Sequence, residues 1–204
     1  MEFSSTHASV PISSVARVFP GAAAHQLNAA LGGHHASVLS VRALSDGGID
    51  PSEVEEISVE NVVRLSPYTT HYGDVVIAAR GTQLKVAVVD TDVAGAILGA
   101  TLIGVRAGDE VLPEVILAYL RSAAGRAALA ARLRSATGQV ALTARDVREI
   151  AIPVPPIRMQ RLIAGVVKAM GEFAIASRDA VARREQVAAD LVLRLFAGEE
   201  PTDG

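Results

Sequence analysis

Residues 150–163 read IAIPVPPIRMQRLI, and this stretch separates two differently patterned parts of the chain. Three prolines, Pro153, Pro155 and Pro156, stand within four positions. A proline ring holds φ at about −65° and disfavours helical backbone at the residue before it. The pattern therefore predicts an extended segment, a rigid joint, and then a helix with Gln160 in its first turn. We expect Gln160 to dock this helix onto the preceding domain.

The stretch after the joint has the pattern of one long amphipathic helix. No proline occurs between Ile157 and Ala197, and apolar residues recur at spacings of three and four. About 40 residues at a rise of about 1.5 Å each span on the order of 60 Å. One small domain cannot cover a stripe of that length, so we expect the helix to pair with a helix of another chain; folding back on its own domain is the alternative. The residues expected at this dimer or partner contact are Val166, Met170, Phe173, Val187, Leu191 and Leu195.

Residues 10–105, well before the joint, are mostly strand-like. The stretch 36–44 is rich in β-favouring residues and ends at a Gly-Gly turn. Two apolar runs, 75–79 and 84–89, flank a short Gly-containing connection, which is typical of a β-hairpin. The stretch 95–107 predicts one buried strand or a pair of strands.

Helical spacing replaces the strand pattern over 112–136, where Gly125 is the candidate break between two helices. Thr143 and Asp146 predict the N-terminal cap of a further short helix over 143–150. We therefore expect an α+β fold: a β-rich domain with a few helices, followed by one long C-terminal helix that forms a coiled-coil-like spacer. The expected divisions are a β-rich domain over 1–155, a long helix over 156–197 and a disordered tail over 198–204.

Composition narrows the class of protein. Half of the 204 residues are hydrophobic, which indicates a globular chain, and the absence of cysteine excludes disulfides and Cys-based zinc sites. Neither a signal peptide nor an apolar run of about 18 residues is visible, so we expect a cytoplasmic protein without a membrane span.

Charge is unevenly distributed along the chain. The formal net charge of −3 argues against a nucleic-acid binder. However, residues 46–60 carry six acids and no base, whereas residues 115–148 carry six arginines and a single acid, Asp146. Guanidinium groups match phosphate oxygens, so the arginine-rich stretch favours phosphate contact, with a solvated helix face as the alternative.

Catalytic patterns are missing from the sequence. It contains neither a GxGxxG nor a GxxxxGK[ST] motif. His34 and His35, with His25, suggest a metal corner, but adjacent strand residues point to opposite faces. Asp74 and Lys85 distantly resemble a nuclease carboxylate–lysine pair, although a Gly-Asp turn before a strand is the simpler interpretation. We predict no catalytic residue, no metal and no cofactor.

Five segments, taken in order, resemble the target-recognition half of a type I restriction–modification specificity (S) subunit. The last of them is the most specific, because it combines a turn, a short helix, a double proline and Gln160. The family usually carries two recognition domains and two spacer helices in about twice this length. Met159 stands where the family often has Glu, and Pro156–Ile157 replaces its Pro-Leu. The five segments are 10–21, 38–49, 72–82, 112–122 and 136–167.

The resemblance implies a protein that binds double-stranded DNA and does no chemistry itself. It would hold a DNA methyltransferase subunit, and indirectly a restriction (motor nuclease) subunit, on a bipartite target; those partners use S-adenosylmethionine and ATP. The chain is expected to be a complete half-length subunit that forms a homodimer through its helix. Residues 46–60 are expected to face away from DNA or toward a partner.

Two loops are the candidates for DNA contact. Arg80 has the geometry to read guanine and Gln83 to read adenine, while Arg132 and Arg134 are candidates for phosphate contact. The candidate set comprises Arg80, Gly81, Thr82, Gln83 and Lys85 in the first loop, Thr137, Gly138 and Gln139 in the second, and the two arginines beside it.

Two other functions compete with this interpretation. A lone half-subunit could act as a decoy or regulator that competes for the methyltransferase. The chain could also be an interaction adaptor without DNA specificity of its own. Formation of a complex that methylates a bipartite site distinguishes these functions.

Overall fold

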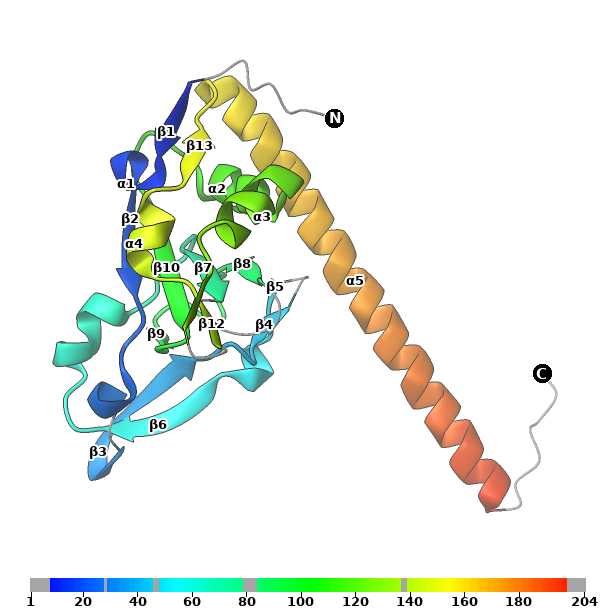
Figure 1. Ribbon diagram of the computed structural model, residues 1–204. Coiled ribbons are helices and arrows are strands. Elements are labelled where there is room, and N and C mark those ends of the chain that lie inside the picture. Colours follow the sequence, from blue (N-terminus) through cyan, green and yellow to red (C-terminus); the bar gives the residue numbers. More distant parts are fainter. Residues whose placement is uncertain (1–7, 28, 46–47, 79–83, 137–138, 198–204) are drawn as a thin grey trace. The chain divides into compact units, whose positions relative to one another are not determined.

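The computed structural model shown in Figure 1 describes residues 8–27, 29–45, 48–78, 84–136 and 139–197. The chain divides into two compact units, Met1–Val167 and Lys168–Gly204, which we call unit 1 and unit 2. Unit 1 combines small β-sheets with short helices, and a long helix begins at its end. The predicted α+β class with a long C-terminal helix is confirmed.

The central sheet of unit 1 has four antiparallel strands in the order β2-β10-β7-β8. All four residues of β7 are buried, as expected of a strand with a neighbour on each side and helices packed nearby. The predicted hairpin is confirmed, because β7 and β8 pair with Val76 opposite Ala87. The strand bounds are β2 Ala16–Pro20, β7 Val75–Ala78, β8 Val86–Val88 and β10 Leu102–Ala107.

A second sheet places β3 between β6, which is antiparallel to it, and β9, which is parallel to it. The stretch 95–107 therefore forms two strands, one of the two alternatives predicted, and these strands belong to different sheets. The sheets meet where Gly21 approaches Gly99, and a Cβ on Gly21 would lie 1.9 Å from the carbonyl oxygen of Gly99. The remaining bounds here are β3 Ala29–Leu39, β4 Leu44–Ser45, β5 Gly48–Ile49, β6 Glu55–Val59 and β9 Ile97–Leu98; β4 pairs with β5.

The helices after the central sheet correct two expectations. The chain does break into two helices, α2 (Pro113–Arg121) and α3 (Ala123–Ala130), but at Ser122 rather than at Gly125. The Ser122 hydroxyl accepts a hydrogen bond from the Gly125 N–H at 3.1 Å and so caps α3. Gly125 is instead a site of close approach, since a Cβ there would lie 2.0 Å from the Tyr119 carbonyl oxygen.

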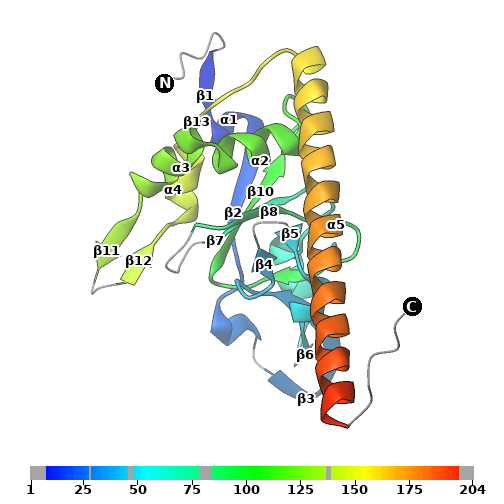
Figure 2. The ribbon, with the colours of Figure 1, turned by 90° about the vertical axis from the view of Figure 1, so that its right-hand side faces the viewer.

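The end of the predicted 112–136 helix is also different. Residues Arg134–Ala136 form strand β11, which pairs antiparallel with β12 (Gln139–Ala141). Figure 2 shows this two-stranded sheet extending beyond α3. The spacing of apolar residues could not separate this short strand from the helix before it, because three residues are too few to show a period.

A short helix and strand lead from this hairpin to the joint. Helix α4 (Ala144–Arg148) carries the full capping box, in which the Thr143 hydroxyl accepts from Asp146 N–H and Asp146 accepts from Thr143 N–H. Strand β13 (Ala151–Pro153) then pairs antiparallel with the N-terminal strand β1 (Ser9–Pro11), as Figure 1 shows. The extended segment expected before the double proline is therefore a paired strand.

Helix α5 spans Ile157–Phe196, 40 residues, as the sequence predicts. Its first residues belong to unit 1, where Ile163 and Val167 pack against the main apolar core. That core is built by helices and the central sheet together; its fully buried members include Ile12, Ile77, Ile116, Leu120, Leu129, Ile150 and Ile152. Across the described part of the chain, no helix is both long and apolar enough to cross a membrane. The other elements are α1 Ile12–Val15 and three 3-10 turns, η1 Ala24–Leu27, η2 Pro51–Glu53 and η3 Val63–Tyr68.

Candidate functional site

The two loops predicted to contact DNA lie largely outside the described residues. Residues 80–83 connect β7 to β8, and residues 137–138 connect β11 to β12. The side chains of Arg134 and Gln139 also fall outside the description, although their strands are defined. The roles of Arg80, Gly81, Thr82, Gln83, Arg134, Thr137, Gly138 and Gln139 stay predictions.

Two predicted DNA contacts are described, and both form hydrogen bonds within unit 1. The Lys85 ammonium donates to the carbonyl oxygen of Leu44 at 2.8 Å. The Arg132 guanidinium donates through Nη2 to the carbonyl oxygen of Glu149, also at 2.8 Å. Lys85 is thus bound to the β4 backbone and Arg132 to the end of α4, so the structure does not bring these two cations to one place. Each keeps further N–H donors beyond the bond described.

A buried ion pair that the sequence did not reveal joins Asp74 to Arg106. Val105 of β10 pairs with Val75 of β7, and the next position places Arg106 opposite Asp74. Arg106 Nε and Nη2 donate to the two carboxylate oxygens at 2.8 and 2.7 Å, and Asp74 is only 1% exposed. Asp74 also accepts from the His71 N–H at 2.8 Å. This carboxylate is therefore occupied by a structural pair, which agrees with the turn interpretation rather than with a nuclease pair.

Phe19 on β2 lies close to Arg17 and Arg106, which are opposite each other on β2 and β10. Its ring covers Gly104, where a Cβ would lie 2.3 Å from the ring edge. The guanidinium carbons of Arg17 and Arg106 lie 5.5 and 5.4 Å from the ring centroid, within the range of a cation–π contact. Arg106 is neutralised by Asp74, whereas Arg17 forms no hydrogen bond or ion pair with any described residue.

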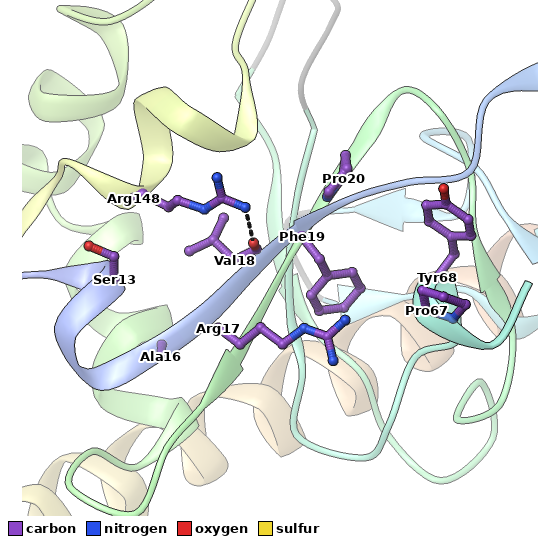
Figure 3. Close-up of a pocket in the computed structure, with 9 residues that line it drawn as sticks. All are labelled: Ser13, Ala16, Arg17, Val18, Phe19, Pro20, Pro67, Tyr68 and Arg148. Carbon is purple, nitrogen blue, oxygen red and sulfur yellow. Dashed lines mark hydrogen bonds between the residues drawn. The ribbon is translucent and has the colours of Figure 1, made fainter.

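An open pocket of about 450 Å³ lies along β2 beside this ring (Figure 3). Arg148 of α4 reaches β2 and donates through Nη2 to the Val18 carbonyl oxygen at 2.9 Å. On the other side of the pocket, the Tyr68 hydroxyl accepts from the Gln26 side-chain amide at 2.9 Å, which leaves its own O–H hydrogen free to donate. The pocket lining is Ser13, Ala16, Arg17, Val18, Phe19, Pro20, Pro67, Tyr68 and Arg148. No signal in the sequence groups these residues, since they come from four separate segments.

Gln160 occupies the first turn of α5 and is only 3% exposed. Its side-chain oxygen accepts from the Leu112 N–H at 2.8 Å. Its side-chain nitrogen donates to the Glu110 carbonyl at 3.0 Å and to the Pro155 carbonyl at 2.9 Å. A single amide thus binds the loop before α2 and the proline joint to the start of α5. Pro155 is buried at this contact, whereas Pro156 is exposed and Pro153 pairs in β13.

The apolar stripe of α5 is exposed along its length. The side chains concerned are between about half and three-quarters exposed, values typical of a surface that lacks its partner. The predicted stripe residues are Val166, Met170, Phe173, Val187, Leu191 and Leu195; Met159, Leu162, Val181 and Val192 extend the stripe.

Metal ligands do not cluster in the described ranges, where no group of three or more His, Asp or Glu side chains could hold an ion. His34 and His35 lie in β3 opposite Val59 and Ser58 of β6.

Neither the scan of protein-family models nor the search of curated proteins found a match. Solved structures do match. The HsdS subunit from Thermoanaerobacter tengcongensis is 22% identical, with a TM-score of 0.57, over 97% of this chain and 50% of that one. The type I restriction–modification S subunit from M. genitalium is 14% identical, with a TM-score of 0.60, over 98% of this chain and 49% of that one.

A chain from a type I R-M system, solved to explain its complex assembly and conformational transition, is 18% identical with a TM-score of 0.62. The match covers 94% of this chain and 45% of that chain. Nearly the whole chain therefore shares the fold of S subunits, and it spans about half the length of the structures it matches.

Proposed function

We propose that this chain is a DNA sequence-recognition subunit of a type I restriction–modification system. The observation that carries the proposal is the fold, which matches half of an S-subunit chain over nearly all of this sequence. In this role the chain does no chemistry. It binds double-stranded DNA and positions a DNA methyltransferase subunit, together with a restriction subunit where one is present.

Two copies of the chain would rebuild the full-length arrangement. An S subunit of twice this length carries two recognition domains, so a two-fold homodimer supplies the missing half. The exposed stripe of α5 supports this arrangement, because apolar side chains at helical spacing need a covering surface. The proposed target is a bipartite, palindrome-like site whose gap depends on the length of the paired helices.

An antiparallel pair centred on Ser177 would bring part of the exposed stripe together, although Met170 then faces Arg184. Reversing the helix about that position places Phe173 opposite Val181 of the second copy and Val166 opposite Ala188. Met159 then faces Leu195, so apolar side chains meet apolar side chains near both ends.

The joint at residues 150–163 would set the direction of the helix from the recognition domain, residues 1–155. Gln160 hydrogen-bonds three backbone groups, and the prolines limit the backbone at the end of β13 and in the residues after it. A joint without free rotation lets the helix, residues 156–197, act as a spacer of fixed geometry. The tail 198–204 has no part in this proposal.

Base reading is assigned to the two loops at residues 80–83 and 137–139. Both connect antiparallel strands at the end of a hairpin, a place where side chains can enter a DNA groove. The acidic net charge suggests weak binding by the chain alone and tight binding only with the methyltransferase.

Co-expression with an adenine methyltransferase subunit tests the proposal. The expected product is a complex with two copies of this chain that methylates a bipartite DNA site, as measured by transfer of a labelled methyl group to a library of duplexes. A complex that forms but blocks methylation would support the decoy function instead. Failure to form any complex would favour the adaptor and contradict the proposal.

A further inference from the structure

The pocket along β2 presents hydrogen-bond donors and no carboxylate. Ser13 and Tyr68 contribute hydroxyl groups, and Arg17 and Arg148 contribute guanidinium groups. Neither arginine forms an ion pair with any residue that the structure describes. This pocket therefore holds two cations without an ion-pair partner among the described residues, although Arg17 also borders the hollow that contains Asp109 and Glu110.

We propose that this pocket binds a phosphate of the DNA backbone, between Arg17 and Arg148, with the Tyr68 hydroxyl as a further donor. The inference rests on the proposed function, since it assumes that unit 1 binds DNA. It adds a phosphate contact formed by residues outside the two loops assigned to base reading. Such a contact fixes the position of the domain on the duplex and is independent of sequence.

The local packing holds both cations ready for an anion. Arg17 and Phe19 lie on the same face of β2, and the ring lies at cation–π distance from the guanidinium. Arg148 uses one N–H on the Val18 carbonyl, which leaves several of its five N–H donors available. Figure 3 shows Arg148 and Arg17 extending from either side of β2, with the Tyr68 hydroxyl at the far end of the pocket. Side chains that are positioned before binding lose less conformational entropy when they bind.

Neighbouring hollows do not offer the same chemistry. The hollow beside η1 and η3 includes Glu60. The hollow beside α1 shares Ser13, Ala16 and Arg17 with the β2 pocket, but it also includes Asp109 and Glu110, so both hollows are less favourable for an anion. The space beside Arg121 and Arg126 holds only about 40 Å³. The β2 pocket thus combines sufficient volume, donors and the absence of acids.

The test is a salt titration of DNA binding by the full chain and three variants. The probe is a fluorescent duplex of random sequence, about 30 base pairs long, and the anisotropy is measured between 25 and 200 mM salt, roughly the range over which phosphate contacts weaken. We expect Arg17→Gln combined with Arg148→Gln to lower the slope of log K against log salt by about 0.9, which corresponds to the loss of one phosphate contact. At 0.1 M salt this is a loss of affinity of about tenfold.

Two variants separate a phosphate contact from a general charge or folding effect. Arg17→Lys with Arg148→Lys keeps both charges and should retain the slope of the unsubstituted chain. Arg42→Gln removes one charge from an exposed arginine that pairs with Glu53 on another part of unit 1, and it should also leave the slope unchanged. Thermal unfolding of each variant shows whether it folds. If the Gln pair does not fold, the single variants Arg17→Gln and Arg148→Gln are titrated in its place, and an unchanged slope in both overturns the inference.

Two outcomes overturn the inference for different reasons. If the unsubstituted chain binds DNA and the Gln pair keeps its full slope, the pocket is not a phosphate site, although the proposed function stands. If the unsubstituted chain shows no DNA binding at 25 mM salt, either alone or with the methyltransferase subunit, the proposed function fails and this inference fails with it.

Discussion

The first eleven residues of α5 and the remainder of the same helix have opposite relations to their surroundings. Residues 157–167 belong to unit 1, where Gln160 is buried and Ile163 and Val167 pack against the apolar core. From Lys168 onward, apolar residues such as Phe173 and Leu193 are at least two-thirds exposed. The start of α5 thus has one face packed against its own chain, whereas Met159, Leu162 and Val166 on its other face belong to the exposed stripe that continues through the remainder.

Apolar residues at helical spacing can therefore stabilise either the fold of their own chain or its association with another molecule. At the start of α5 the contacts are made with residues of the same chain and contribute to folding at any protein concentration. In the remainder, the stripe gains little by burial until another molecule covers it. Burial of an apolar side chain stabilises by roughly 1.5–3 kcal/mol, so the apolar side chains from Lys168 to Phe196 represent substantial binding free energy that the single chain does not use.

The largest effect is expected from Phe173→Glu, in the exposed segment. The two-fold symmetry places the charge in the interface twice, and burial of an unpaired carboxylate is costly. We expect the dissociation constant of the homodimer to rise by at least about 100-fold, since about 1.4 kcal/mol corresponds to a factor of ten. Sedimentation at several concentrations measures it.

Ala182→Glu is the matched control, because it adds the same charge to an exposed position on the other side of α5. This variant should remain dimeric. If the unsubstituted chain stays monomeric at high concentration, the exposed segment of α5 does not form a homodimer and the prediction is wrong.

Gln160→Ala should give the next largest effect, in the buried segment. The substitution leaves the Leu112 N–H and the carbonyls of Glu110 and Pro155 without their partner. We expect a loss of about 2–4 kcal/mol in the free energy of unfolding, since each unsatisfied buried group costs about 1–3 kcal/mol and water will satisfy some of them. Urea unfolding measures the loss.

Arg161→Ala, at the exposed neighbouring position, should change the same free energy by less than about 0.5 kcal/mol. Equal stabilities of the two variants would show that the start of α5 is no better anchored than its remainder.

The smallest effect is expected from Lys168→Ala, directly after the boundary. Lys168 and Glu172 form an i,i+4 pair at 3.9 Å, with both side chains more than two-thirds exposed. Such pairs contribute about 0.3–0.5 kcal/mol to a helix. Thermal unfolding should therefore shift by no more than a degree or two, and a larger shift would mean that the boundary between the segments lies further along α5.

Features set by neighbouring residues could be predicted from the sequence. The β7–β8 hairpin could be predicted from two apolar runs and the Gly-containing connection between them. Helix α5 could be predicted from a long stretch without proline in which apolar residues recur at helical spacing. The capping box of α4 requires only Thr143 and Asp146, three positions apart. In each case the determining residues lie close together in the chain.

Features set by distant residues could not be predicted. Asp74 and Arg106 meet because β7 and β10 are neighbours in the sheet, and no local pattern contains that pairing. The pocket beside Phe19 combines β2, η3, α1 and α4 for the same reason. The break at Ser122 depends on a cap, while Gly125 is required by the close approach of the Tyr119 carbonyl.

The pairing of β1 with β13 has a consequence for how the protein is made. Ser9 pairs with Pro153, so this contact closes a loop of about 140 residues and is formed at a high cost in chain entropy. On the ribosome, the N-terminal strand emerges early and keeps an unpaired edge until β13 has been synthesised. Gln160 follows within a few residues and bonds to the backbone before α2. Unit 1 therefore completes its folding only as the long helix begins to emerge, which delays exposure of the apolar stripe until a folded domain precedes it.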